Sequence, residues 1–198
     1  LLGNGRGLGL RQSIYSRDKS EVLLIDYFSI FYLTILPMKR TVSMSGSQKE
    51  FDALLNIVRE VYENLPFNRH LGLSIVNLKL DEAGFAFSMG DELIGNEVHG
   101  ILHGGVISAV LDTTGGLTAT ASAVKRKLGL TRDEITDWIA RIGTIDMRVD
   151  YLRPGRGKRF HSTGTVMRTG NKVAVTRMEL WNEENVLIAV GTGAYIVG

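Results

Sequence analysis

One short segment of this sequence combines the residue types that hydrolytic chemistry needs. His103-Gly104-Gly105 stands where a polar, glycine-rich loop (residues 91–100) runs into a largely apolar stretch (residues 104–124) that predicts a long helix. Two glycines at the start of a helix let a ligand approach the backbone closely, and the free N–H groups there bind developing negative charge. The segment therefore predicts a helix start that can hold an oxyanion.

A carboxylate follows on the same helix. Asp112 lies nine residues after His103, among the apolar residues Val110, Leu111 and Leu117. A carboxylate in such surroundings needs a polar partner, a water-filled pocket or a function. Together with an oxyanion-binding helix start, a carboxylate base suits the attack of water on a carbonyl group. The alternative is that Asp112 is only a core acid whose hydrogen bonds are satisfied.

The remaining pattern predicts the elements that must position these groups. A capping box of Ser47 and Glu50 starts an amphipathic helix that Pro66 stops, and Thr131 with Glu134 starts a short helix. Strands are expected at residues 73–80, 84–89, 141–152, 160–168, 172–181 and 181–197, with turns at 81–83, 169–171 and 182–185. The long helix is apolar nearly all round, so it must be covered on several sides. We therefore expect an α+β fold in which one curved antiparallel sheet wraps around a long central helix.

The strand expected at residues 141–152 alternates cleanly between apolar and polar side chains. This period of two predicts that its two faces differ. One face would carry Ile145, Met147, Val149 and Tyr151, and the other would carry Thr144, Asp146, Arg148 and Asp150.

Composition excludes several classes of function. The chain of 198 residues holds no cysteine, which rules out disulfide frameworks, thiolate zinc sites, iron–sulfur clusters and cysteine nucleophiles. His70, His99 and His161 show no metal-ligand spacing with a carboxylate, so no metal site is expected. Six of the 23 basic and three of the 21 acidic residues fall in residues 1–44, which leaves the rest of the chain with a net charge of −1. This balance argues against a nucleic-acid partner.

The first 46 residues differ from the rest, and we expect them to be an N-terminal arm that the activity does not need. The apolar run at residues 22–37 is short for a membrane span and is interrupted by Asp26, so membrane contact is not expected. It resembles a poor signal peptide, but no Ala-x-Ala-like cleavage site follows it. Residues 47–198 are expected to form a single cytoplasmic domain.

Several motifs in residues 48–198 agree in order and spacing with one known family. They are Pro66-Phe67-Asn68-Arg69, Ile101-Leu102-His103-Gly104-Gly105, Ile142-Gly143-Thr144-Ile145-Asp146, the stretch 149–157 and Gly170-Asn171-Lys172-Val173-Ala174-Val175. With them the chain resembles the hotdog-fold acyl-CoA thioesterases of the PaaI type, and within these the YigI-type bacterial medium- and long-chain enzymes. The resemblance implies a hotdog fold that dimerises as a double hotdog. It also implies hydrolysis of fatty acyl-CoA to a free fatty acid and coenzyme A, without a metal or redox cofactor.

The resemblance also implies roles for particular residues. Gly104 matches the family's oxyanion glycine, Asp112 its catalytic carboxylate and Thr144 its water-orienting hydroxyl. Asn96 matches the family's loop asparagine, although it lies seven residues before His103, one more than in some relatives. Substrate contacts are further expected from His103, Gly105, Arg153 and Arg156, the two arginines meeting the phosphates of coenzyme A.

Simpler roles are open for the same residues. His103 could only cap the helix, and Thr144 could be an ordinary strand residue. The basic loop that holds Arg153 and Arg156 could be a solvated turn. Asp112 itself could act as a general base on water or attack directly through a mixed anhydride.

Two functions other than hydrolysis are considered as alternatives. A hotdog dehydratase or hydratase needs a catalytic histidine in a His-Phe-Pro-type segment, which this sequence lacks. A non-catalytic acyl-CoA sensor usually carries a helix-turn-helix, and residues 1–44 show no paired amphipathic helices. The acyl chain length and the choice between a dimer and a tetramer stay open at this point.

Helix geometry predicts a shared site. Gly104 and Asp112 are eight residues apart on one helix, about 12 Å along its axis, whereas an attacking water must lie about 3 Å from both its base and the reacting carbon. Two such helices related by a two-fold axis could meet this requirement. We therefore expect a homodimer or tetramer in which Gly104 of one subunit works with Asp112 and Thr144 of another.

Overall fold

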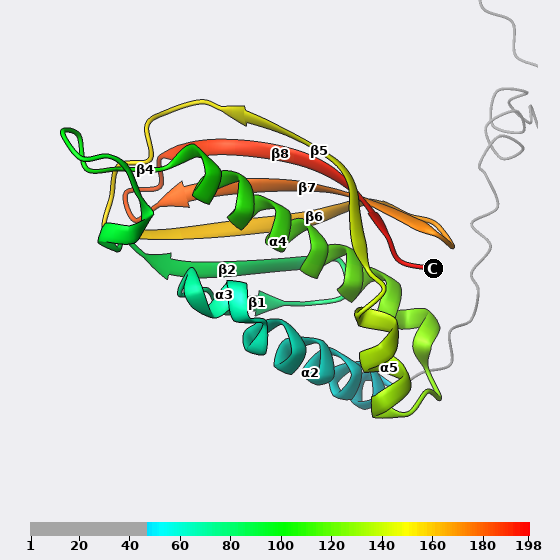
Figure 1. The fold of residues 1–198 in the computed structure, drawn as a ribbon. Coiled ribbons are helices and arrows are strands. Elements are labelled where there is room, and N and C mark those ends of the chain that lie inside the picture. The colour runs from blue at the N-terminus through cyan, green and yellow to red at the C-terminus, as the bar shows by residue number, and fades with distance from the viewer. Residues whose placement is uncertain (1–46) are drawn as a thin grey trace, which may run out of the picture. The chain divides into compact units, whose positions relative to one another are not determined.

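The computed structural model describes residues 47–198 (Figure 1). The expectation of a dispensable arm at residues 1–46 lies outside the described residues. The helical elements are α2 (Gln48–Asn64), α3 (Pro66–His70), η1 (Asp91–Leu93), α4 (Gly104–Ala123), η2 (Val124–Lys127) and α5 (Arg132–Ile139). The strands are β1 (Ser74–Leu78), β2 (Glu82–Ser88), β3 (Ile94–Asn96), β4 (Ile101–Leu102), β5 (Gly143–Tyr151), β6 (Arg159–Thr169), β7 (Val173–Asn182) and β8 (Leu187–Ile196).

A single large sheet carries the fold. Six strands pair antiparallel in the order β1-β2-β6-β7-β8-β5, and β3 pairs with β4 in a small separate hairpin. Figure 1 shows α4 lying across the sheet, with α2 beside it and α5 near its end. The predicted α+β hotdog fold, a long central helix packed against an antiparallel sheet, is confirmed. Its dimerisation as a double hotdog stays a prediction.

The central helix α4 is enclosed from its second turn onward. Its side chains from Val110 are mostly buried, and Leu111 and Leu117 are fully buried. Hydroxyl side chains on this helix donate to carbonyls one turn earlier, as from Thr114 to Val110 and from Thr118 to Thr114, each at 2.7 Å. Because these hydrogen bonds satisfy the hydroxyls internally, a helix with several threonines can lie in an apolar core.

Both predicted capping boxes are present. The Ser47 hydroxyl accepts from the Glu50 amide while the Glu50 carboxylate accepts from the Ser47 amide, and Thr131 with Glu134 repeats the arrangement at α5. These hydrogen bonds lower the pKa of Glu50 and of Glu134, first through the backbone N–H of the capping residue. Helix α2 ends at Asn64, and Pro66 begins the short helix α3 because proline is well tolerated at the first helical position.

Two sequence expectations about the first half of the domain need correction. The turn expected at residues 81–83 is displaced toward the N-terminus, because β2 already begins at Glu82. The loop expected at residues 91–100 contains the helical turn η1 and the strand β3, which pairs with β4. A strand as short as β4, Ile101–Leu102, carries too little periodicity to be recognised in a sequence.

The expected faces of β5 are also corrected. The register between β5 and β8 shifts between Thr144 and Asp146, so Ile145 is an extra residue in this strand. The bulge takes Ile145 off the face that it was expected to share with Met147 and leaves it 52% exposed. Because the extra residue shifts the alternation of side chains by one position, Thr144 lies on the same side of the strand as Met147. On that side, the Thr144 hydroxyl bonds to Asp112 of α4 and Met147 packs against the core. Simple alternation had put these two residues on opposite faces.

No helix in residues 47–198 is both long enough and apolar enough to cross a membrane.

Neighbouring glycines on α4 give a test of how tightly the helix meets the sheet. A Cβ at Gly115 would lie 2.7 Å from Cζ of Tyr195, whereas one at Gly116 would meet only ordinary contacts, the nearest at 3.4 Å from the Tyr62 hydroxyl. We predict that Gly115→Ala lowers the free energy of unfolding by about 2 kcal/mol through overpacking. Gly116→Ala should instead be neutral or stabilising, because alanine favours a helix over glycine by about 1 kcal/mol. Thermal unfolding of the two variants measures this difference, and equal melting temperatures would contradict the described packing.

Candidate functional site

The start of α4 leaves one backbone donor available. His103 is the N-cap, and its side-chain Nδ1 accepts a hydrogen bond from the Gly105 amide at 2.9 Å. The amides of Val106 and Ile107 both donate to the His103 carbonyl. Within residues 47–198 the amide of Gly104 donates no hydrogen bond. The capping histidine therefore accepts from the Gly105 amide, and the Gly104 N–H is left without a partner in the described residues, at the positive end of a 20-residue helix.

The peptide group after Gly104 is held in place by two hydroxyls that the sequence analysis did not identify. The Gly104 carbonyl accepts from the Tyr151 hydroxyl at 3.1 Å and from the Ser108 hydroxyl at 3.0 Å. The oxygens of these two hydroxyls lie 2.5 Å apart, so either one can donate to the other in place of its hydrogen bond to the carbonyl. The sequence held a partial signal, because Ser108 lies one helical turn after Gly104 and Tyr151 was expected on the same face of its strand as Met147 and Val149.

A carboxylate and a hydroxyl form the second part of the site. The Thr144 hydroxyl donates to Oδ1 of Asp112 at 2.8 Å, so the bulge in β5 brings together two residues that lie 32 positions apart. Asp112 is half-buried. A carboxylate held in this way keeps its second oxygen free for chemistry.

These contacts divide the predicted catalytic residues into two clusters. Gly104 lies with Ser108 and Tyr151 at the first turn of α4, and Asp112 lies with Thr144 two turns further along. Eight residues at 1.5 Å per residue separate the clusters by about 12 Å along the helix axis. One reacting carbonyl cannot contact both clusters of the same chain.

Three other predicted site residues lie near the start of α4: Asn96 at the end of β3, and Arg153 and Arg156 in the loop between β5 and β6. The Asn96 side chain accepts from the His99 amide at 3.1 Å and so closes its own turn. Arg153 donates to the Leu187 carbonyl at 3.0 Å, and Arg156 donates to the His99 carbonyl at 3.2 Å. Because all three side chains are exposed, these contacts leave part of each accessible to a ligand.

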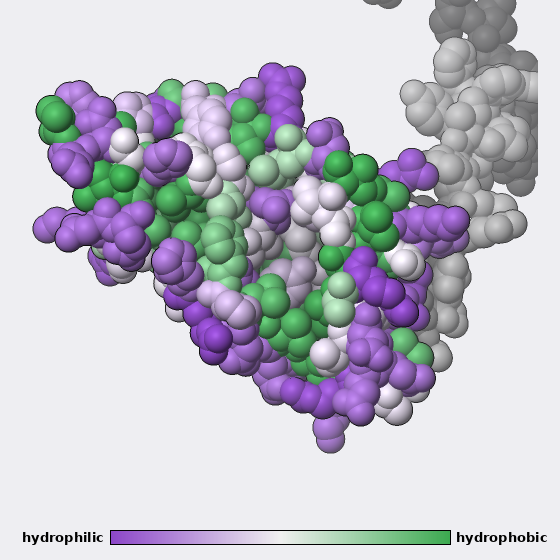
Figure 2. Space-filling view, viewed as in Figure 1, coloured by the Kyte–Doolittle hydropathy of each residue, from purple (hydrophilic) through white to green (hydrophobic). Residues whose placement is uncertain are grey.

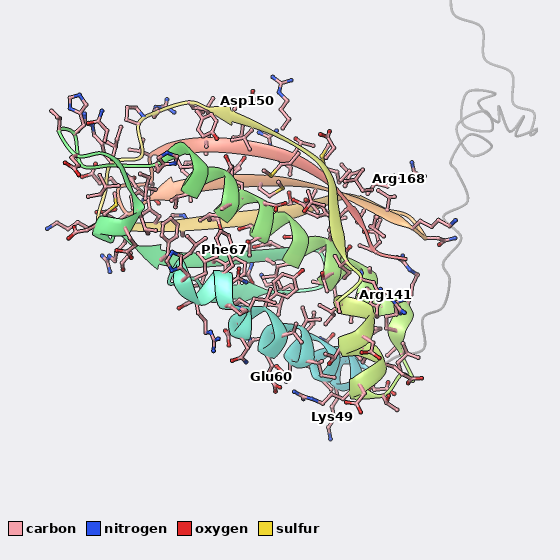
Figure 3. All side chains as sticks on the ribbon, viewed as in Figure 1. Lys49, Glu60, Phe67, Arg141, Asp150 and Arg168 are labelled. Carbon is pink, nitrogen blue, oxygen red and sulfur yellow. The ribbon has the colours of Figure 1, made fainter. Side chains whose placement is uncertain are left out.

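Two grooves flank the start of α4. One, of about 360 Å³, is lined by Gly104, Ile107, Tyr151, Arg153 and Pro154 among others. The other, of about 310 Å³, is mostly apolar and includes His103, Gly105, Val106, Ala109 and Phe67. Phe67, labelled in Figure 3, comes from α3 and is 55% exposed. Figure 2 shows neutral and apolar surface over α4 between α3 and β5, with charged surface around the edge of this face.

In the described part of the chain, no three histidine, aspartate or glutamate side chains gather in a way that could hold a metal ion.

Comparisons with known proteins show the family of this chain. Residues 99–189 match the family model of the thioesterase superfamily. The chain is 46% identical over 145 residues to the medium/long-chain acyl-CoA thioesterase YigI of Escherichia coli, covering 73% of this chain and 94% of that protein. The chain belongs to the thioesterase superfamily.

Solved structures support the same assignment. A thioesterase-superfamily protein from Shewanella oneidensis is 49% identical, with a TM-score of 0.72 over 77% of this chain and 100% of that one. The E. coli PaaI protein from the phenylacetic acid degradation operon is only 18% identical, with a TM-score of 0.60 over 75% of this chain and 96% of that one, so it shows the shared fold alone. The family resemblance inferred from the motifs is therefore confirmed.

The capping role of His103 can be measured through stability. His103→Ala removes the acceptor for the Gly105 amide, so we predict a loss of about 1 kcal/mol in the free energy of unfolding. His103→Asn should retain most of the stability because asparagine is a good N-cap. His99→Ala is the matched control, since it removes an exposed histidine from the same loop without touching the helix. Urea denaturation measures the free energy of unfolding of all three variants. An unchanged unfolding midpoint for His103→Ala would contradict the capping role of His103.

Proposed function

We propose that this protein hydrolyses medium- or long-chain acyl-CoA thioesters to a free fatty acid and coenzyme A. The observation that carries the proposal is the free Gly104 amide at the start of α4, on the same helix as a carboxylate held by Thr144. Support comes from the 46% identity to a relative whose name states this activity. The reaction needs an oxyanion donor and a base or nucleophile, and these residues supply both.

Gly104 would bind the thioester carbonyl oxygen. Its N–H points out of the helix start, where the helix dipole favours negative charge. A tetrahedral intermediate places a full negative charge on that oxygen, so the hydrogen bond strengthens as the reaction proceeds. The hydrogen bonds from Ser108 and Tyr151 to the Gly104 carbonyl support the proposal, because they fix the first turn that carries the donor.

Asp112 would supply the attacking group. As a general base it takes a proton from water while the water oxygen bonds to the carbonyl carbon; as a nucleophile it forms a mixed anhydride that water then cleaves. In either route the C–S bond breaks, the acyl group gains an oxygen from water and the sulfur of coenzyme A leaves as a thiol. The Thr144 hydroxyl holds one oxygen of Asp112 and so orients the other.

The loops around Gly104 would bind the rest of the substrate. Acyl-CoA has an apolar chain at one end and phosphates at the other. Arg153 and Arg156 are proposed to meet the phosphates, since guanidinium groups pair well with them. His103, Gly105 and Asn96 are proposed to contact the substrate near the thioester. The largely apolar groove that includes Phe67 is suited to the acyl chain.

The separation of the two clusters favours a site shared between subunits. We propose a homodimer, or a tetramer built from such dimers, in which Gly104 of one subunit faces Asp112 and Thr144 of the other. The edge strand β5 supports this arrangement: within the described residues it pairs with β8 alone, so its other side is open. Ile145, Tyr151 and Leu152 near this edge are each about half exposed, at 52%, 54% and 48%.

Removal of the carboxylate charge tests the role of Asp112. We predict that Asp112→Asn reduces turnover of palmitoyl-CoA at least about 100-fold, the scale expected for losing a catalytic base. The fold should survive because the side chains have nearly the same shape. Asp137→Asn, which neutralises an exposed aspartate on α5, should leave the rate unchanged. Thiol release measures turnover, and more than about a third of the wild-type rate in Asp112→Asn would exclude Asp112 as the catalytic carboxylate.

Removal of the Gly104 amide hydrogen tests the oxyanion donor and the shared site together. Proline is tolerated at the first helical position, and His103 already has the extended backbone that residues before proline prefer (φ −63°, ψ 138°). Gly104→Pro should therefore fold and lose at least about 100-fold in turnover. Gly104→Ala keeps the N–H, and its Cβ would lie 3.6 Å from the Tyr151 ring, so it should lose far less.

Mixed dimers then decide where the two groups meet. In a heterodimer of Gly104→Pro with Asp112→Asn, one of the two shared sites has both working groups, while each parent homodimer has none. Co-expression with two affinity tags isolates the heterodimer, and we expect it to recover about half of the wild-type activity under the shared-site arrangement. An inactive heterodimer would overturn the shared site without affecting the proposed hydrolysis. A panel of acyl-CoA substrates of increasing chain length measures the preferred acyl group.

A further inference from the structure

Tyr195 lies directly behind the Asp112–Thr144 pair. It sits on β8 opposite Thr144 in the register of β5 and β8, at the point where the bulge begins. Its side chain is 1% exposed, so it belongs to the core and not to the solvent-facing site. None of the steps of the proposed hydrolysis uses it.

The ring of Tyr195 occupies a slot between two glycines. A Cβ at Gly193 would lie 2.7 Å from the Tyr195 hydroxyl, and a Cβ at Gly115 would lie 2.7 Å from ring atom Cζ. Gly193 belongs to the sheet and Gly115 to α4, so the ring lies between these two layers. Because glycine has no side chain, the Tyr195 ring can approach the backbone closely at both positions.

The hydroxyl of Tyr195 reaches the residue that carries the carboxylate. It donates to the main-chain carbonyl of Asp112 at 3.3 Å. Burial first, and then the negative charge of Asp112, raise the pKa of Tyr195 above its ordinary value. The phenol therefore stays protonated, and remains a donor, at every pH at which the enzyme would be assayed.

We propose that Tyr195 is a positioning residue that fixes Asp112 relative to Thr144. Its backbone pairs with the strand segment that carries Thr144, and its hydroxyl holds the helical turn that carries Asp112. One rigid side chain thus sets the distance between the two partners. The inference rests on the proposed function, since it assigns Tyr195 a part in the same reaction without contact with the substrate.

Tyr62, on α2, provides a matched control because its hydroxyl also bonds to α4. It is also buried, its hydroxyl bonds to the Thr120 hydroxyl at 2.9 Å, and it lies beside Gly116 as Tyr195 lies beside Gly115. Burial raises its pKa to about 12, so it too stays protonated. Thr120 lies two turns beyond Asp112 and faces the core, so loss of this hydrogen bond should affect stability alone.

The test compares Tyr195→Phe with Tyr62→Phe in the full chain. Both variants keep the ring and lose one buried hydrogen bond, so both should lower the melting temperature by a few degrees. We expect Tyr195→Phe to lower kcat for palmitoyl-CoA about fivefold at 25 °C with KM unchanged, because only the placement of the reacting group is altered. Tyr62→Phe should leave both constants at wild-type values. Equal kcat values for the two variants would overturn the inference.

A double-mutant cycle with Thr144→Val gives a second readout. If Tyr195 acts by holding Asp112 against Thr144, its loss has little further effect once the Thr144 hydroxyl is gone. The combined variant should therefore show nearly the kcat of Thr144→Val alone, whereas multiplicative losses would mean that Tyr195 acts elsewhere and would overturn the inference. A wild-type protein that releases no thiol from acyl-CoA would refute the proposed function itself. An active wild type with an unaffected Tyr195→Phe variant would refute the positioning role alone.

Discussion

Enclosure of α4 is the constraint on which the rest of the structure depends. A helix that is apolar on nearly every side cannot face water, so the sheet must curve around it and the other helices must cover what remains. Close contact then requires glycine where strand side chains meet the helix, as at Gly115 against Tyr195. It also requires that buried hydroxyls bond to the helix itself, as Thr114 and Thr118 do.

The exposure of α4 to solvent decreases along its length, and its polar groups lie at different points of this change. At its first turn the backbone is accessible, His103 takes up one of the two glycine amides, and the Gly104 amide is left over. Two turns later Asp112 lies at the border between solvent and core, with a half-buried side chain. From Thr114 onward the residues of the helix are buried. A single element therefore provides a backbone N–H without a partner in the described residues, a carboxylate and a stable core, but it cannot bring the first two to one carbonyl.

Local signals in the sequence were sufficient for most elements. Both capping boxes, the long helix at 104–123 and the hairpin of β6 and β7 depend on residues close together in the chain, so pattern and spacing predicted them. The candidate Gly104 and Asp112 came from the same kind of signal. The contacts of Tyr151 and Tyr195 join residues 47 and 83 positions apart, and the short hairpin of β3 and β4 has almost no periodicity. Such features are decided by packing between elements, which a local pattern does not contain.

The bulge in β5 shows how such a packing requirement overrides a local pattern. Thr144 and Met147 are three residues apart, so a regular strand would place them on opposite faces. The contact with Asp112 needs Thr144 on the inner face, and the core needs Met147 there as well. Both conditions hold only if one extra residue is inserted between them, and Ile145 is that residue. An apolar side chain is left 52% exposed as a result. The exposed Ile145 thus accompanies a strand that places Thr144 against Asp112 and Met147 against the core at the same time.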